Sequence, residues 1–153
     1  MEWTTTLERF GTSLGIDHLA PDVHSSCSLL FDGRYEVTFT HDEDDRSLLM
    51  YCELGDASRL SRESCLTLLK ASLLGAETGG AALSIHDAVD QVVLWKRFDE
   101  DTLNADTMRN AVNDFLAQVT VWKQRLQELG SVDTEYGSSG TDMDTMNNFG
   151  MFV

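Results

Sequence analysis

The sequence predicts an α+β fold with the element order α-β-β-β-α-β-β-α, in which helices pack on a curved antiparallel sheet. Two patterns predict it: apolar residues at helical spacing in three segments, and short runs with the period-two alternation or dense apolar content of strands between them. With 153 residues the chain is long enough for one domain, which we expect to span residues 1–130.

The first half of this order contains one helical pattern and three strand-like runs. Strands are predicted at residues 26–32, 35–40 and 47–54, and an Asp32-Gly33 turn joins the first two into a hairpin. The acidic stretch 41–46 reads as a polar connection. The N-terminal helix is indicated by apolar residues at steps of four, three and four: Trp3, Leu7, Phe10 and Leu14.

The second half contains two helical patterns and one hairpin. A helix is predicted over residues 58–75 with Ser61 as its N-cap, and a hairpin over 82–85 and 91–97. A long final helix, capped by Asp101 or Asn104, is expected to end at Gly130. Its apolar stripe follows alternating steps of four and three: Met108, Val112, Phe115, Val119, Trp122, Leu126 and Leu129.

Residues 131–153 differ in composition from the rest of the chain. They contain four acidic residues, no Lys or Arg, and little periodicity, which predicts an acidic flexible tail. The tail ends in an apolar tip, and our hypothesis is that this tip covers the open face of the sheet when no partner is bound. The residues of the tip are Phe149, Met151, Phe152 and Val153.

The charge balance limits the class of partner. The chain has 26 acidic residues against 11 Lys and Arg, a formal net charge of −15, which argues against nucleic acid and against anionic membranes as partners. Three cysteines without a CxxC pair indicate buried, reduced thiols and a cytoplasmic location. The N-terminus lacks a signal-peptide pattern, and no apolar run is long enough to cross a membrane.

No catalytic motif is present, and we expect no cofactor and no enzymatic activity. The histidines are scattered, and neither a metal-binding spacing nor a phosphate loop occurs. The densest polar cluster, 41–45, has carboxylates that suit a hard cation but lacks the alternation of a calcium loop. A solvated turn is the favoured interpretation, and a small metal-dependent enzyme using this cluster stays an alternative.

The chain has more apolar residues than a single core would bury, which predicts two contact surfaces. If one face of the sheet packs on the helices, Leu30, Leu49 and Tyr51 point to the other face, where they would form a partner-binding patch. The second helix has an unusually wide apolar arc, and residues 91–97 are apolar on both faces. A homodimer interface explains this second excess, with these residues as candidates: Leu66, Leu69, Leu73, Val93 and Trp95.

The element order and several local segments resemble the class I type III secretion chaperones, the family of the Tir chaperone. The resemblance covers about residues 3 to 129 and depends on pattern, size and acidity rather than on one diagnostic motif. The segments that carry it are SLLFDG (28–33), YEVTF (35–39), LLKASLLG (68–75), TGGAAL (78–83), VVLWKR (92–97) and the final helix with Phe115 and Trp122.

The resemblance implies a cytoplasmic homodimer that holds the N-terminal region of a secreted effector in extended form and keeps it secretion-competent. It places the dimer contact on the second helix and the late strand, and effector contacts on the first helix and the sheet. The expected effector-binding residues are therefore Phe10, Leu30, Leu49 and Tyr51. A contact between the tail and the secretion apparatus, and a dimeric regulatory module of the same fold, stay open as alternatives.

Overall fold

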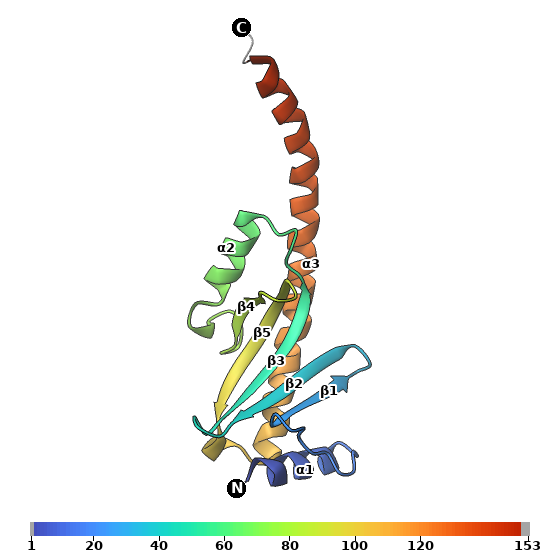
Figure 1. The fold of residues 1–153 in the computed structure, drawn as a ribbon, viewed down its shortest axis with the longest axis vertical. Helices are drawn as coiled ribbons and strands as arrows, with labels where there is room; N and C mark the ends of the chain where they lie inside the picture. Colours follow the sequence, from blue (N-terminus) through green and yellow to red (C-terminus); the bar gives the residue numbers. More distant parts are fainter. Residues whose placement is uncertain (1, 151–153) are drawn as a thin grey trace.

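A computed structural model describes the backbone of residues 2–150 and the side chains of residues 2–134. Within this part of the chain, three α-helices and two short 3-10 helices accompany one five-stranded antiparallel sheet (Figure 1). The predicted α+β class and element order are confirmed. The elements are α1 Trp3–Ser13, β1 Ser26–Phe31, β2 Tyr35–Asp42, β3 Ser47–Asp56, α2 Arg62–Ala71, η1 Leu73–Gly75, β4 Ala82–His86, β5 Gln91–Asp99, η2 Glu100–Thr102 and α3 Ala105–Gly150.

The strand order in the sheet is β1-β2-β3-β5-β4, so β5 is inserted between β3 and β4. Every neighbouring pair is antiparallel, and one cross-strand row runs through the whole sheet: Ser28, Thr38, Tyr51, Trp95 and Ala82. Because successive side chains of a strand point to opposite faces, this register assigns each residue to a face.

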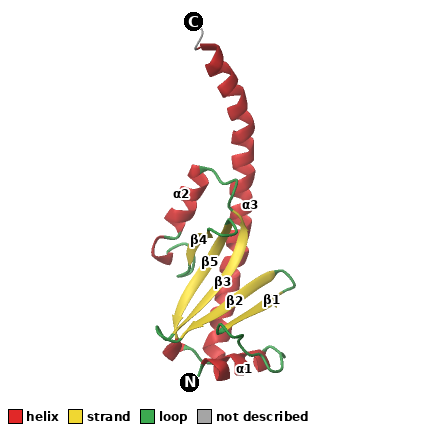
Figure 2. Cartoon of the chain, in the orientation of Figure 1, coloured by secondary structure: helices red, strands yellow, loops and turns green. Residues whose placement is uncertain are grey.

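One face of the sheet packs on α3, and α1 packs against α3 at one end (Figure 2). The core consists of the inward residues of the strands and the apolar stripes of both helices. Cys52 belongs to this core, and burial raises the pKa of its thiol to about 11, which keeps the thiol protonated. The largest fully buried side chains include Trp122, Phe115, Phe10, Phe39, Leu48, Met50 and Leu94.

The second helix, Arg62–Ala71, is shorter at both ends than the predicted range 58–75. The Ser61 side chain accepts a hydrogen bond from the amide of Ser64 at 3.1 Å, which confirms the predicted N-cap. The helix stops at Ala71 instead of Gly75, because Leu74 and Gly75 adopt left-handed backbone angles. A Cβ on Gly75 would lie 2.5 Å from the Cα of Gly80, so this tight turn requires glycine.

The predicted end of the last helix at Gly130 is wrong. The Asn104 side chain caps the start of α3 as predicted, and the helix then continues to Gly150. A glycine inside a helix costs only about 1 kcal/mol, so it weakens a helix without ending it. The division of the chain into a domain and a flexible tail stays a prediction. The apolar tip lies outside the residues whose side chains are described.

A carboxylate just beyond Gly130 links α3 to the start of α2. Asp133 accepts hydrogen bonds from the Ser61 amide at 2.8 Å and from the Ser64 hydroxyl at 3.0 Å. Burial of this carboxylate raises its pKa, but the hydrogen bonds from both serines outweigh burial and hold the pKa of Asp133 below its usual value. Asp133 therefore acts as a second N-cap of α2, supplied from a distant part of the sequence.

Replacing Asp133 with asparagine is expected to lower the melting temperature by about 2–4 °C, because the amide keeps one acceptor oxygen and loses the second hydrogen bond and the charge, a loss of about 1 kcal/mol. A group with a depressed folded-state pKa stabilises the fold above its unfolded pKa and loses this effect as the pH falls through the folded pKa. The melting temperatures of wild type and Asp133→Asn should therefore converge in acid. Asp114→Asn, an exposed site on the same helix, is the control, and a constant difference at every pH would contradict the assignment.

Candidate functional site

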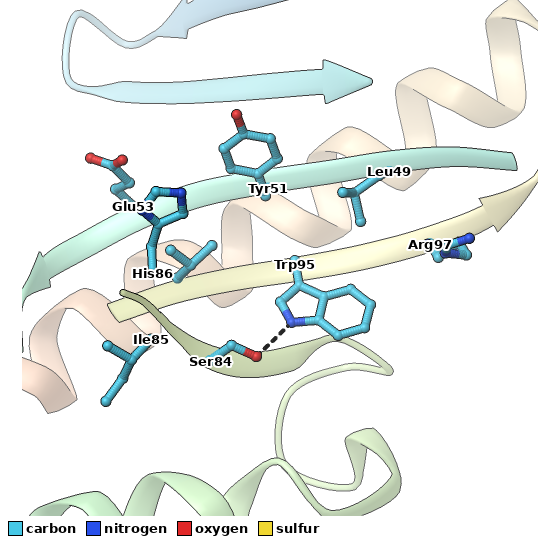
Figure 3. A pocket seen from close by; sticks show the side chains of 9 residues that line it. Leu49, Tyr51, Glu53, Ser84, Ile85, His86, Trp95 and Arg97 are labelled. Atoms are coloured by element: carbon cyan, nitrogen blue, oxygen red, sulfur yellow. Dashed lines mark hydrogen bonds between the residues drawn. The ribbon is translucent and has the colours of Figure 1, made fainter. Parts of the chain in front are cut away.

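The face of the sheet that α3 leaves uncovered carries an apolar hollow of about 500 Å³, here called the groove. Leu49 and Tyr51 of β3 line it, as do Val93 and Trp95 of β5. Figure 3 shows Trp95 between β3 and β4. Ile85 of β4 also lines it. The remaining lining residues are polar: Glu53, Ser84, His86 and Arg97.

The register of the sheet explains why these residues meet. Tyr51 pairs with Trp95 across β3 and β5, so both side chains point to the same face. The indole Nε1 of Trp95 donates a hydrogen bond to the Ser84 hydroxyl at 2.8 Å, which holds the ring over β4 (Figure 3). Val92 and Leu94 point to the opposite face and are buried in the core. Both faces of β5 are apolar because one face packs in the core and the other lines the groove.

The half of the same face formed by β1 and β2 is polar. The hydroxyls of Ser28 and Thr38 lie 2.8 Å apart and those of Ser26 and Thr40 2.9 Å apart, which satisfies these groups across the strand pair. A second hollow of about 400 Å³ adjoins the groove, and Tyr51 lines both. The open face is therefore apolar over β3, β5 and β4, and polar or charged towards β1 and β2. The other residues of this polar hollow are Ser28, Arg34, Glu36, Thr38, Glu53 and Lys123.

The structure separates the predicted effector-binding residues. Leu49 and Tyr51 are half-buried in the groove. Leu30 points to the same face and is 63% exposed, but it lines none of the hollows described here. Phe10 is fully buried and contacts the Phe39 ring edge-on, with centroids 6.1 Å apart. The family resemblance suggested Phe10 as a contact residue, but the residue lies on the inner face of α1 and has no accessible surface.

The predicted dimer residues fall on two adjoining surfaces. Leu66, Leu69 and Leu73 are exposed by 38%, 65% and 67%, whereas Val93 and Trp95 lie in the groove beside Leu49 and Tyr51. Sequence reasoning also missed two exposed apolar residues, Leu74 and Ile85.

Ile85 connects the two surfaces. It lines the groove and also a small apolar hollow of about 190 Å³ between α2 and β4, to which Leu69 contributes. The sequence predicted that Ile85 lies in a strand, but it did not predict that the side chain is exposed. The exposure follows from the position of β4 at the edge of the sheet. The apolar surface therefore continues from the groove to the leucines of α2.

The acidic stretch 41–45 has contacts typical of a charged turn. Asp42 accepts hydrogen bonds from the amides of Asp44 and Asp45, and Asp45 pairs with Arg97 at 3.0 Å. Among the described residues, no group of three or more His, Cys, Asp or Glu side chains has a geometry that suits a metal ion. Within the same residues, no helix has the length and hydrophobicity required of a membrane span.

An apolar hollow on the sheet face opposite α3 is typical of a domain that binds another protein. Residues 5–123 match the model of the Tir chaperone protein (CesT) family, and the chain belongs to that family. The resemblance predicted from the sequence is thereby confirmed. The Tir chaperones of Citrobacter freundii and Escherichia coli are each 26% identical to this chain over 106 residues, which cover 69% of it and 67% of each relative.

Solved structures of low sequence identity share the fold. The HopA1–SchA chaperone–effector complex contains a chain that matches with a TM-score of 0.68 at 20% identity, covering 80% of this chain and 93% of that one. A chain of the ExsC–ExsE complex matches with a TM-score of 0.70 at 18% identity, covering 81% and 96%. Yersinia pestis SycH, in complex with a fragment of YscM2, gives 0.63 at 14% identity, covering 78% and 98%.

Proposed function

We propose that this chain is a cytoplasmic bacterial chaperone that binds the N-terminal region of a type III secreted effector in extended form and keeps it secretion-competent. The observation that carries this proposal is the groove, an apolar surface on the sheet face opposite α3 (Figure 1). Membership of the Tir chaperone family supports it, as does the shared fold with a chain of a chaperone–effector complex.

The groove suits an extended segment better than a folded domain. It is open and shallow, and its side chains come from three neighbouring strands, so a chain in extended form can place apolar side chains in it. Each large apolar side chain that is buried there contributes about 1.5–3 kcal/mol. The adjoining polar hollow, which shares Tyr51 with the groove, would then contact the next residues of the segment.

The second part of the proposal is that the chain acts as a homodimer. Exposed leucines on α2 and the adjoining edge of the groove form a continuous apolar surface of the kind that a second copy would bury. In this arrangement the partner protomer covers Leu69, Ile85 and Trp95, and the effector segment contacts Leu49 and Tyr51. Two-fold symmetry would then supply two effector-binding grooves to one bound segment.

Affinity purification from the native bacterium, followed by mass spectrometry, tests this function. We expect one or a few secreted proteins to co-purify, with their N-terminal regions protected from limited proteolysis. The Tyr51→Glu variant, purified in parallel, should lose them. Recovery of cytoplasmic regulators alone would instead identify a dimeric regulatory module, and recovery of no partner at any expression level of the secretion system would contradict the proposal.

A further inference from the structure

The sheet is split between β2 and β3. Their pairing ends at Thr38 and Tyr51, although β2 begins at Tyr35 and β3 continues to Asp56. Beyond the last pair, the β1–β2 hairpin diverges from β3 (Figure 1). The polar hollow lies in this split, since it is lined from both strands and by Lys123 of α3.

The register shows which main-chain groups face the split. Neighbouring residues of a strand direct their N–H and C=O groups to opposite edges. The His41 amide donates a hydrogen bond to the Ser25 carbonyl, on the β1 side, at 3.0 Å, so the even-numbered residues of β2 direct these groups towards β3. The pair that would come next, Glu36 with Glu53, does not belong to the register. Both residues therefore turn their N–H and C=O groups towards the split.

Glu53 offers these main-chain groups to a partner more readily than a strand residue inside a sheet does. Its carbonyl oxygen accepts a hydrogen bond from the Cys52 thiol at 3.5 Å, and a thiol is a weak donor. The β3–β5 register shifts between Glu53 and Gly55, and such a bulge bends its strand, which explains why β3 leaves β2 here. Glu53 is exposed and lines the polar hollow, so another extended chain can reach this edge.

The two outer edges of the sheet are partly protected. At β1, the Ser26 amide donates to the Asp22 carboxylate at 2.9 Å, and the Ser26 carbonyl accepts from the Asp22 amide at 2.8 Å. At β4, the Leu83 amide donates to the Ser72 hydroxyl at 2.8 Å. Contacts of this kind hinder pairing with a further strand. In the described part of the chain, the β3 edge at Glu53 has only the weak thiol contact.

We propose that the partner segment bound in the groove pairs with β3 at Glu53 through main-chain hydrogen bonds, a contact that rests on the proposed function. Tyr51 and Glu53 each line both the groove and the polar hollow, so an extended chain that leaves the groove passes this edge. Main-chain pairing is independent of side chains, whereas the apolar groove selects them. The segment therefore needs a residue with a free N–H at this position, which excludes proline there.

A peptide that contains no effector sequence tests this pairing. Titration of the full chain with acetyl-Thr-Val-Thr-Val-Thr-amide, followed by ¹H–¹⁵N NMR, should shift the Glu53 amide signal and slow its hydrogen exchange. The same peptide with all five residues N-methylated should leave the signal in place, because it has no main-chain donor within the segment. Equal shifts with the N-methylated peptide, or shifts confined to β1 or β4, would overturn the proposal.

Two variants of Glu53 separate its main chain from its side chain. Proline removes the N–H and is tolerated at a strand edge, so Glu53→Pro should bind the peptide about fivefold more weakly, the effect of one lost hydrogen bond. Glu53→Ala keeps the N–H and should bind as wild type does. Equal affinities of the two variants, both shown to be folded by thermal melting, would contradict the pairing.

The peptide experiment also separates this contact from the proposed function. If Glu53→Pro does not fold, the comparison with the N-methylated peptide on the wild-type chain decides the question. Because the peptide carries no effector sequence, a failure to capture an effector would count against the proposed function alone. A failure of the peptide to shift the Glu53 signal at millimolar concentration would count against the pairing alone.

Discussion

Replacement of Tyr51 by glutamate is expected to weaken effector binding by at least about 30-fold, the loss that marks a central interface residue. Tyr51 lines both the groove and the polar hollow, so a charge there would lose its hydration under the bound segment without gaining a partner. The fold should tolerate the change, because Tyr51 lies on the sheet face opposite α3 and is only partly buried there. Calorimetric titration with the captured effector region, together with thermal melting, measures both quantities.

Leu30→Glu is the matched control for this experiment. Leu30 is apolar and points to the same face, but it lies outside the groove and is 63% exposed. We expect its variant to bind the effector nearly as wild type does. If Leu30→Glu and Tyr51→Glu weaken binding equally, the binding surface extends over the β1 end of the sheet. If Tyr51→Glu unfolds the protein, the open face is part of the stabilising core and the groove is not a binding site.

Replacement of Leu69 by aspartate is expected to convert a dimer into a monomer or an aggregate. Leu69 is 65% exposed in one chain, so the substitution should cost little in an isolated protomer. In a dimer interface, the same carboxylate would be buried without a partner and cost about 1–3 kcal/mol or more for each of two symmetric copies. Light scattering should give twice the chain mass of 17.1 kDa for wild type, and Leu69→Asp should lower it.

Two further variants define the extent of this interface. Thr67→Asp places the same charge on a different face of α2 and should leave the dimer intact. Trp95→Glu should dissociate the dimer if the partner protomer covers the β4 side of the groove, as proposed. A Trp95→Glu protein that stays dimeric but loses the effector would assign the whole groove to effector binding. A wild-type mass of 17.1 kDa at micromolar concentration would refute the dimer itself.

The sequence predicts the local part of this architecture well. Period-two alternation correctly assigned Leu49 and Tyr51 to the open face and Met50 to the core, because the direction of a side chain in a strand depends only on its position along that strand. The N-cap at Ser61 was predictable for the same reason, since its hydrogen bond joins residues three positions apart. Features of this kind are predictable because they depend only on a few residues that are close together in the sequence.

The features that sequence reasoning missed depend on contacts between distant residues. Val93 and Trp95 join Tyr51 in one groove only because β5 is inserted between β3 and β4, an order that periodicity does not specify. The hydrogen bonds from the Ser61 amide and Ser64 hydroxyl to Asp133 likewise join α2 to a segment far along the chain. Helical spacing identified the inner face of α1, but it did not distinguish a core residue such as Phe10 from a contact residue.

The insertion of β5 between β3 and β4 also has a consequence for folding kinetics. The hairpins β1–β2, β2–β3 and β4–β5 join strands that are adjacent in sequence, whereas β3 and β5 are separated by α2 and β4. Pairing of strands so far apart in sequence costs loop-closure entropy, so such contacts form late on average. Tyr51 and Trp95 meet across this pair, so we expect the groove to form after the local hairpins.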